Sequence, residues 1–152
     1  MKKEFLLVLL TVTSFVQINA QTLPRQYVIT ADTATKQLLD NDYWQVLQDE
    51  NGKFTIDDVQ HEPLANQFTN FTKNSKDNFA KTTWFRFNIK NSTGKILKLS
   101  ISSDAAVTDF YVPDSNGIMH HFTTGTEIPW RKKNGFKKDN AIPFEMKPGG
   151  KY

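Results

Sequence analysis

Residues 81–102 constrain the fold most, because two stretches of alternating apolar and polar residues flank a turn-rich centre. The alternating apolar positions are Phe85, Phe87, Ile89, Leu97, Leu99 and Ile101. We expect two strands that pair antiparallel and each bury one face against the core. The other face of the first strand carries Trp84, Arg86 and Asn88. We expect these three side chains in solvent, where an aromatic ring, a cation and an amide would bind a ligand. The alternative is that a loop or the lead-in segment covers Trp84 and that Arg86 forms a structural ion pair.

Residues 1–20 are predicted to be a signal peptide. Two lysines precede an apolar run at residues 5–16, and Ala20 is the small residue that a signal peptidase requires for a cut before Gln21. The apolar run is too short to span a bilayer comfortably. We therefore expect an exported protein, with an uncleaved signal anchor as the alternative.

Composition limits which classes of partner and which kinds of site this chain can have. The chain of 152 residues has no internal repeat, and we expect one domain at 43–152 behind a lead-in segment at 21–42, with a short helix at 32–42. The formal net charge of +3 is far below what non-specific nucleic-acid binding uses, so we expect no nucleic-acid partner. The absence of cysteine excludes disulfides, thiolate metal sites and a lipidated N-terminal cysteine.

Local signals mark the start of the expected domain. Residues 43–48 alternate as a strand does and stop at an Asn-Gly pair at 51–52, which is a strong turn signal. Thr55 and Asp58 have the spacing of a capping box, which predicts a short helical turn at 56–60.

Further strands are indicated beyond residue 102. Residues 107–112 and 118–124 flank a Pro-Asp-Ser-Asn-Gly turn and predict a hairpin, and strands are expected at 127–130 and 141–146. Short strands at regular spacing predict an all-β jelly roll or β-sandwich. A turn at 148–150 stands where a returning strand should begin, so we expect the closing strand to be missing and the domain to be truncated at its C-terminal end.

The most specific motif is Trp-x-Arg-x-x-x-x-Asn, which runs from Trp84 to Asn91. It stands in a fixed order with Thr-Ile-Asp-Asp-Val at 55–59, Asp-Phe-Tyr-Val-Pro-Asp at 109–114, Asn-Gly at 116–117 and Ile-Pro-Phe at 142–144. This order resembles, over roughly residues 29–152, the second type of extracellular domain of 7TMR-DISM proteins. Those proteins are bacterial seven-transmembrane receptors with diverse intracellular signalling modules.

The resemblance implies a jelly-roll sensing domain similar to carbohydrate-binding modules. It also implies a periplasmic location, facing the inner membrane of a Gram-negative-type bacterium, and partners in the membrane-embedded and signalling segments of a parent receptor. We expect a small-molecule ligand, either a carbohydrate or a carboxylate, and no cofactor. The alternative is a non-catalytic interaction module that docks on the receptor or on a partner protein.

Patterns of known catalytic and metal sites do not occur in the sequence. There is no nucleophile elbow Gly-x-Ser-x-Gly, no phosphate-binding glycine loop and no His-Glu-x-x-His. His120 and His121 are adjacent on an expected strand, so they should point to opposite faces and not share a metal ion. We expect one packed and one solvated histidine, and no enzymatic activity.

A second candidate binding surface is formed by Trp130 and Arg131 together with the lysines at 132, 133, 137 and 138. Such a basic run would meet an anionic ligand or lipid headgroups, or else form a solvated loop.

Overall fold

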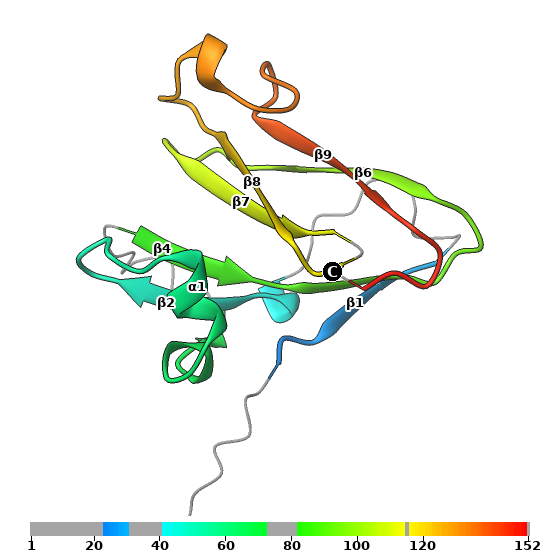
Figure 1. The fold of residues 1–152 in the computed structure, drawn as a ribbon, viewed down its shortest axis with the longest axis horizontal. Helices are drawn as coiled ribbons and strands as arrows, with labels where there is room; N and C mark the ends of the chain where they lie inside the picture. Colours follow the sequence, from blue (N-terminus) through cyan, green and yellow to red (C-terminus); the bar gives the residue numbers. More distant parts are fainter. Residues whose placement is uncertain (1–22, 31–40, 73–81, 115, 152) are drawn as a thin grey trace, which may run out of the picture.

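The computed structural model describes residues 23–30, 41–72, 82–114 and 116–151 (Figure 1). This part of the chain is all-β, as predicted, with one short α-helix and several 3-10 turns. The strands are β1 (Gln26–Ile29), β2 (Gln45–Asp49), β3 (Thr69–Asn70), β4 (Thr82–Arg86), β5 (Asn88–Asn91), β6 (Leu97–Ser102), β7 (Thr108–Pro113), β8 (Met119–Thr124) and β9 (Ala141–Met146). The helical segments are α1 (Ile56–Gln60), η2 (Asn41–Tyr43), η3 (Leu64–Asn66) and η5 (Trp130–Lys132).

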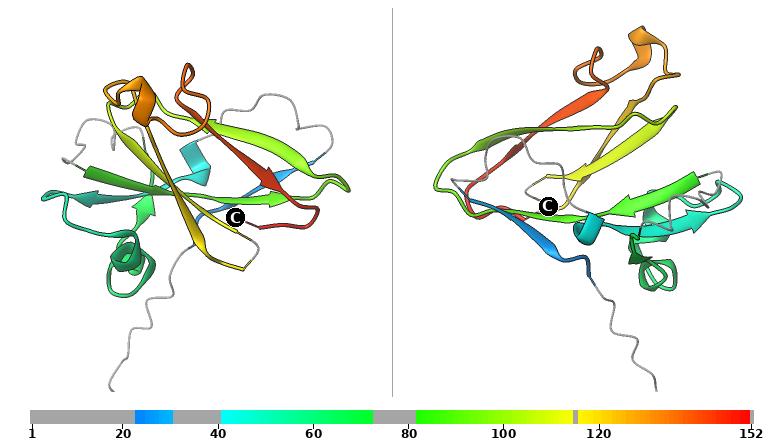
Figure 2. Two further views of the ribbon diagram at one scale, coloured as in Figure 1. Left: turned by 45° about the horizontal axis from the view of Figure 1, so that its top comes forward. Right: turned by 180° about the vertical axis from the view of Figure 1, so that it is seen from behind.

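The strands lie in two layers. In the first, β2 pairs with β3 and β4, while β5, which continues β4 after a break at Phe87, pairs in parallel with β1. In the second, the antiparallel pairs β6–β9 and β7–β8 lie over the first layer (Figure 1). Figure 2 shows that the two layers meet where β5 leads into β6 and diverge from there.

The predicted antiparallel pairing within residues 81–102 is wrong. β4 pairs with β2, with Phe85 opposite Val46, whereas β6 pairs with β9, with Leu99 opposite Phe144. The strands separate because the segment between β5 and β6 is a corner that carries the chain from one layer to the other. Alternation along each strand predicted the strands themselves, but alternation does not select their partners.

The corner is held by Asn91, which has no exposed surface. Its Nδ2 donates to the carbonyl oxygens of Lys95, Met146 and Lys147 at 2.9 to 3.1 Å. Its Oδ1 accepts from the backbone N–H of Thr93 at 2.9 Å and from the Thr93 hydroxyl at 2.7 Å. One buried amide therefore ties β5 to the corner and to the end of β9.

Trp84 and Arg86 do not lie on a solvent-facing side of the first strand, which agrees with the alternative that Trp84 is covered. Trp84 packs against Leu47 of β2 and Val59 of α1, because α1 covers that face of the strand. Phe85, which was expected in the core, is 42% exposed, and its ring lies 5.8 Å from that of Phe71 on the opposite face. Both faces of β4 are thus partly covered.

The start of the domain agrees with its local signals. Asp58 Oδ2 accepts from the Thr55 backbone N–H at 2.8 Å, and the Thr55 hydroxyl accepts from the Asp58 N–H at 3.2 Å, so the capping box precedes α1 as predicted. Asp49 ends β2 and is 1% exposed. Its burial opposes ionisation, but hydrogen bonds from the amides of Phe54 and Lys53 outweigh that effect and hold the Asp49 pKa below its usual value.

Of the predictions for the rest of the chain, some are confirmed, one is wrong and others fall outside the described residues. The β7–β8 hairpin and strand β9 are confirmed. The expected strand at 127–130 is wrong, because Pro129 starts the 3-10 turn η5, in which Lys132 N–H donates to the Pro129 carbonyl at 2.7 Å.

The lead-in segment at 21–42 supplies β1 to the first layer. The signal peptide at 1–20 and all but the end of the expected helix at 32–42 lie outside the described residues.

One hydrophobic cluster joins the two layers, and a second packs α1 on the first layer. The cluster between β1, β5 and the β6–β9 pair contains Ile29, Ile89 and Met146, with Tyr27, Phe87, Leu97, Leu99 and Phe144 around it. The cluster between β2 and α1 contains Leu47, Val59 and Phe68, with Phe54, Ile56, Leu64 and Trp84 around it. None of the described helices is long and apolar enough to cross a membrane.

Candidate functional site

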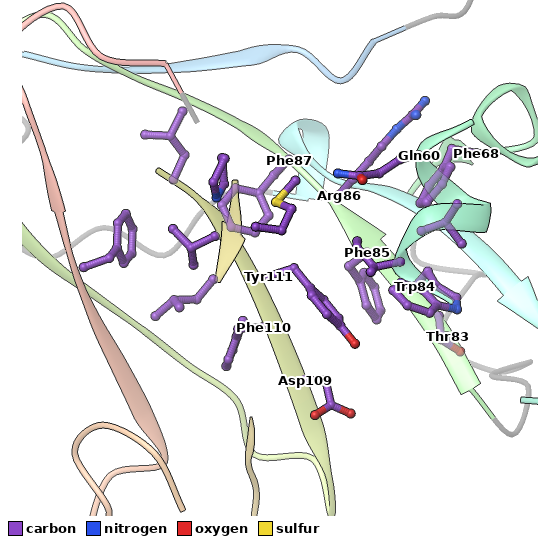
Figure 3. Close-up of a pocket in the computed structure, with 18 residues that line it drawn as sticks. Gln60, Phe68, Thr83, Trp84, Phe85, Arg86, Phe87, Asp109, Phe110 and Tyr111 are labelled. Atoms are coloured by element: carbon purple, nitrogen blue, oxygen red, sulfur yellow. The ribbon is translucent and has the colours of Figure 1, made fainter. Parts of the chain in front are cut away.

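A cavity of about 410 Å³ lies between the two layers, and both hydrophobic clusters contribute to its wall (Figure 3). Residues 83–87 line one side, with Val59 and Phe68 from the cluster under α1. Residues 109–113 of β7 line the other side, with Phe144 from β9. The wall is mostly apolar and aromatic, with few polar groups, which is the usual character of small-molecule sites.

Three rings from three strands form a stacked series at this cavity. The Tyr111 ring stacks on Trp84 across the layers, with centroids 5.9 Å apart and planes 26° apart. It also stacks on His121, its partner across the β7–β8 hairpin, at 4.7 Å and 9°. Burial, and secondarily the negative charge of Asp109, raises the Tyr111 pKa above its usual value, which favours the neutral phenol.

Asp109 brings a carboxylate to the cavity wall, two residues before Tyr111 on the same face of β7 (Figure 3). Its Oδ1 lies 2.8 Å from His121 Nε2 and accepts from the Thr123 hydroxyl at 2.6 Å. The side chain is 44% exposed. Among the described residues only Oδ1 is engaged, so Oδ2 is available to accept from a ligand.

Arg86 lines the cavity but is mainly tied to the protein. Its Nε donates to Gln45 Oε1 at 2.8 Å, its Nη1 donates to the Ala65 carbonyl at 3.0 Å, and the guanidinium lies 4.2 Å from the centroid of the Phe68 ring. Burial lowers the Arg86 pKa, yet a guanidinium remains charged at neutral pH. Arg86 therefore fastens β4 to β2 and η3.

The structure brings together only two of the five predicted ligand-binding residues. Trp84 and Arg86 line the cavity, whereas Asn88 lies outside its wall and accepts from Gln26 Nε2 at 3.2 Å. Trp130 and Arg131 are exposed on η5 and are not among the residues that line the cavity.

Sequence reasoning missed Asp109, Tyr111 and His121. The β7–β8 hairpin was expected, and its register places Tyr111 opposite His121 and Asp109 opposite Thr123. Cross-strand pairing alone would therefore have grouped these side chains. The contact of Tyr111 with Trp84 depends on how the two layers stack, which no local signal reports.

No group of three His, Cys, Asp or Glu side chains able to hold a metal ion occurs in the described part of the chain. Both neighbouring histidines are exposed, so the expectation that one would be packed is wrong. Each lies beside its own carboxylate, His120 at 3.4 Å from Asp114 and His121 at 2.8 Å from Asp109. Each imidazole is thus paired with a different carboxylate.

The comparison with protein families identifies the family and, through it, the general role of the chain. The family model for 7TMR-DISM extracellular 2 matches residues 41–152, which is most of the chain. The chain belongs to this family. Searches among curated proteins and solved structures find no match. Membership makes this chain an extracytoplasmic sensor domain of a membrane receptor.

In this 7TMR-DISM extracellular domain, the motif from Trp84 to Asn91 serves the fold in at least two positions. Arg86 holds β4 to its neighbours, and Asn91 holds the corner between the layers. Trp84 is the motif residue that also reaches an aromatic group of the opposite layer across the cavity.

Proposed function

We propose that this domain is the ligand-sensing part of a bacterial signalling receptor in the periplasm, and that it binds a small carbohydrate, without catalysis, in the cavity between its layers. The observation that carries the proposal is the pairing of an aromatic stack, Trp84 on Tyr111, with the carboxylate of Asp109 on the same wall. Family membership supports a sensor role and a location outside the membrane.

A sugar fits this wall for chemical reasons. The apolar face of a pyranose ring packs well on an indole or phenol ring, and its hydroxyls need acceptors and donors at the edge. The Trp84–Tyr111 stack supplies aromatic surface where the two rings do not cover each other, and Asp109 Oδ2 supplies an acceptor beside it. A cavity of about 410 Å³ falls in the range of small-ligand sites.

A carboxylate ligand is the second candidate. Arg86 carries its positive charge into the wall of the same cavity. The two candidates can be distinguished by measurement. Binding of a carboxylate ligand requires the positive charge of Arg86, whereas binding of a neutral sugar does not.

Thermal unfolding of the purified protein tests the proposal with D-glucose, D-glucuronate and succinate as probes, together with a wider panel of neutral sugars. A neutral sugar that raises the midpoint supports the carbohydrate reading, whereas a response to glucuronate and succinate alone favours the carboxylate. Trp84→Phe and Asp109→Asn should weaken the response, and Trp130→Phe, outside the cavity, should not. A folded protein with no response to any probe would contradict both readings.

The alternative function is a non-catalytic docking module, in which the same faces contact the receptor or a partner. It predicts that Trp84→Ala destabilises the domain, because Trp84 packs in the cluster under α1, while no small probe changes the unfolding of the unmodified protein. The thermal experiment therefore separates the two functions.

A further inference from the structure

The loop between β8 and β9 concentrates the positive charge of the chain. Residues 127–140 contain five Lys and Arg against two Asp and Glu, a net charge that equals the +3 of all 152 residues. The rest of the chain is electrically balanced by comparison. The charge is therefore a local feature of one loop and not a general property of the surface.

The same loop exposes two large aromatic side chains. Trp130 is 59% exposed and Phe136 is 56% exposed, and they stand among the basic residues of the loop. Arg131, Lys132 and Lys138 are exposed as well. Exposed aromatic rings among cations suit a bilayer interface, where rings enter the headgroup region and cations meet lipid phosphates.

The loop has a fixed structure that displays these side chains. The Asn134 N–H donates to the Thr123 carbonyl at 2.9 Å, and the Thr123 N–H donates to Asn134 Oδ1 at 2.7 Å. The Phe136 N–H donates to the Ala141 carbonyl at 2.7 Å. Gly135 has φ +65°, and a Cβ there would lie 2.3 Å from the Ala141 carbonyl oxygen, so this tight turn requires glycine.

The position of the loop leaves it free to meet a flat surface. Figures 1 and 2 show it projecting beyond the ends of β8 and β9, away from the layer that contains β1 and β2. Family membership makes the domain the extracellular part of a membrane receptor, which supplies a membrane as a candidate partner.

We propose that this loop docks on the surface of an anionic lipid bilayer. Trp130 and Phe136 enter the headgroup region, and Arg131, Lys132 and Lys138 meet the phosphates. The aromatic pair favours a bilayer over a soluble polyanion, because cations alone would suffice for the latter. Docking would set the orientation of the sensor domain on the membrane without involving the cavity.

Vesicle flotation of the purified protein tests the proposal with two vesicle types, phosphatidylcholine alone and phosphatidylcholine with about 30% phosphatidylglycerol. The protein should float only with the anionic vesicles, and less as salt is raised. The double variant Arg131→Gln/Lys132→Gln should bind about 25-fold more weakly, at about five-fold for each charge. The matched control Lys53→Gln/Lys95→Gln removes the same charge at exposed positions elsewhere and should bind as the unmodified protein does.

Trp130→Ala separates a bilayer from a soluble polyanion. It should weaken binding to anionic vesicles and leave binding to dextran sulfate unchanged. The proposal is overturned if the protein ignores anionic vesicles, floats equally with neutral ones, loses binding equally in the control double variant, or keeps full vesicle binding in Trp130→Ala. Thermal unfolding of each variant verifies that it is folded.

Discussion

Replacement of Asn91 by alanine should cost the domain a large part of its stability. The substitution removes the two N–H groups that three carbonyl oxygens share and the oxygen that accepts twice from Thr93. A net contribution of about 1 kcal/mol for each of four hydrogen bonds gives about 4 kcal/mol. The carbonyl oxygen of Met146, a residue with no exposed surface, loses a buried partner, which keeps the expected loss at about 3–5 kcal/mol.

Urea unfolding followed by tryptophan fluorescence measures this loss as a fall in the midpoint at unchanged slope. Asn88→Ala on the same strand is the matched control, because among the described residues its side chain makes one hydrogen bond, to Gln26 at 3.2 Å, and its loss should cost about 1 kcal/mol or less. If Asn91→Ala does not fold, Thr93→Val removes only the hydroxyl and should cost about 1 kcal/mol. The reasoning is refuted if Asn91→Ala loses no more than Asn88→Ala.

Three further predictions concern other described contacts. Thr55→Ala breaks the capping box and should lower the free energy of unfolding by about 1 kcal/mol in urea, whereas an unchanged value would mean that α1 needs no cap. Arg86→Lys loses the forked contacts to Gln45 and Ala65 and should cost about 2 kcal/mol; equal stability of the two proteins would contradict the anchoring role. The amides of Ile118 and Asn116, and secondarily His120, hold the Asp114 pKa below its ordinary 3.8, so its ionised form stabilises the fold above that pH and this stability is lost as pH falls through the folded value. Thermal midpoints should therefore drop less below pH 3.8 in Asp114→Asn than in the unmodified protein, and parallel curves would rule this contribution out.

Local signals predicted local structure well. The capping box at Thr55 and Asp58, the turn with Gly52 at φ 64° and the β7–β8 hairpin each depend on residues within a few positions of one another. Such patterns are complete in the sequence, because the groups that hydrogen-bond are neighbours in the chain.

Pairing between distant segments was not predictable in the same way. Residues 97–102 alternate correctly for a strand, but whether they pair with residues 82–91 or with residues 141–146 depends on the corner at Asn91. In the sequence, Asn91 was identified only as the last residue of the motif that begins at Trp84. Its burial becomes visible only when the end of β9 is placed over it.

The candidate site was predicted only in part for the same reason, because its residues come from segments that are distant in the sequence. Trp84 and Arg86 were identified from an aromatic and a cation on one strand face, and the structure places both at the cavity. Their expected exposure was wrong, because α1 and η3 cover that face. Tyr111 joins Trp84 from the other layer, so the stacked pair has no signature in either segment alone.

The most direct test of the proposed sensing site is the fluorescence of Trp84 during titration with a ligand. The chain has three tryptophans, and Trp44→Phe/Trp130→Phe leaves Trp84 as the sole indole reporter. The neutral sugar with the largest thermal shift should change the Trp84 emission in a saturable way, and Asp109→Asn should weaken that response. Emission that stays constant across the whole sugar and acid panel, from a protein shown to be folded, would contradict a ligand site between the layers.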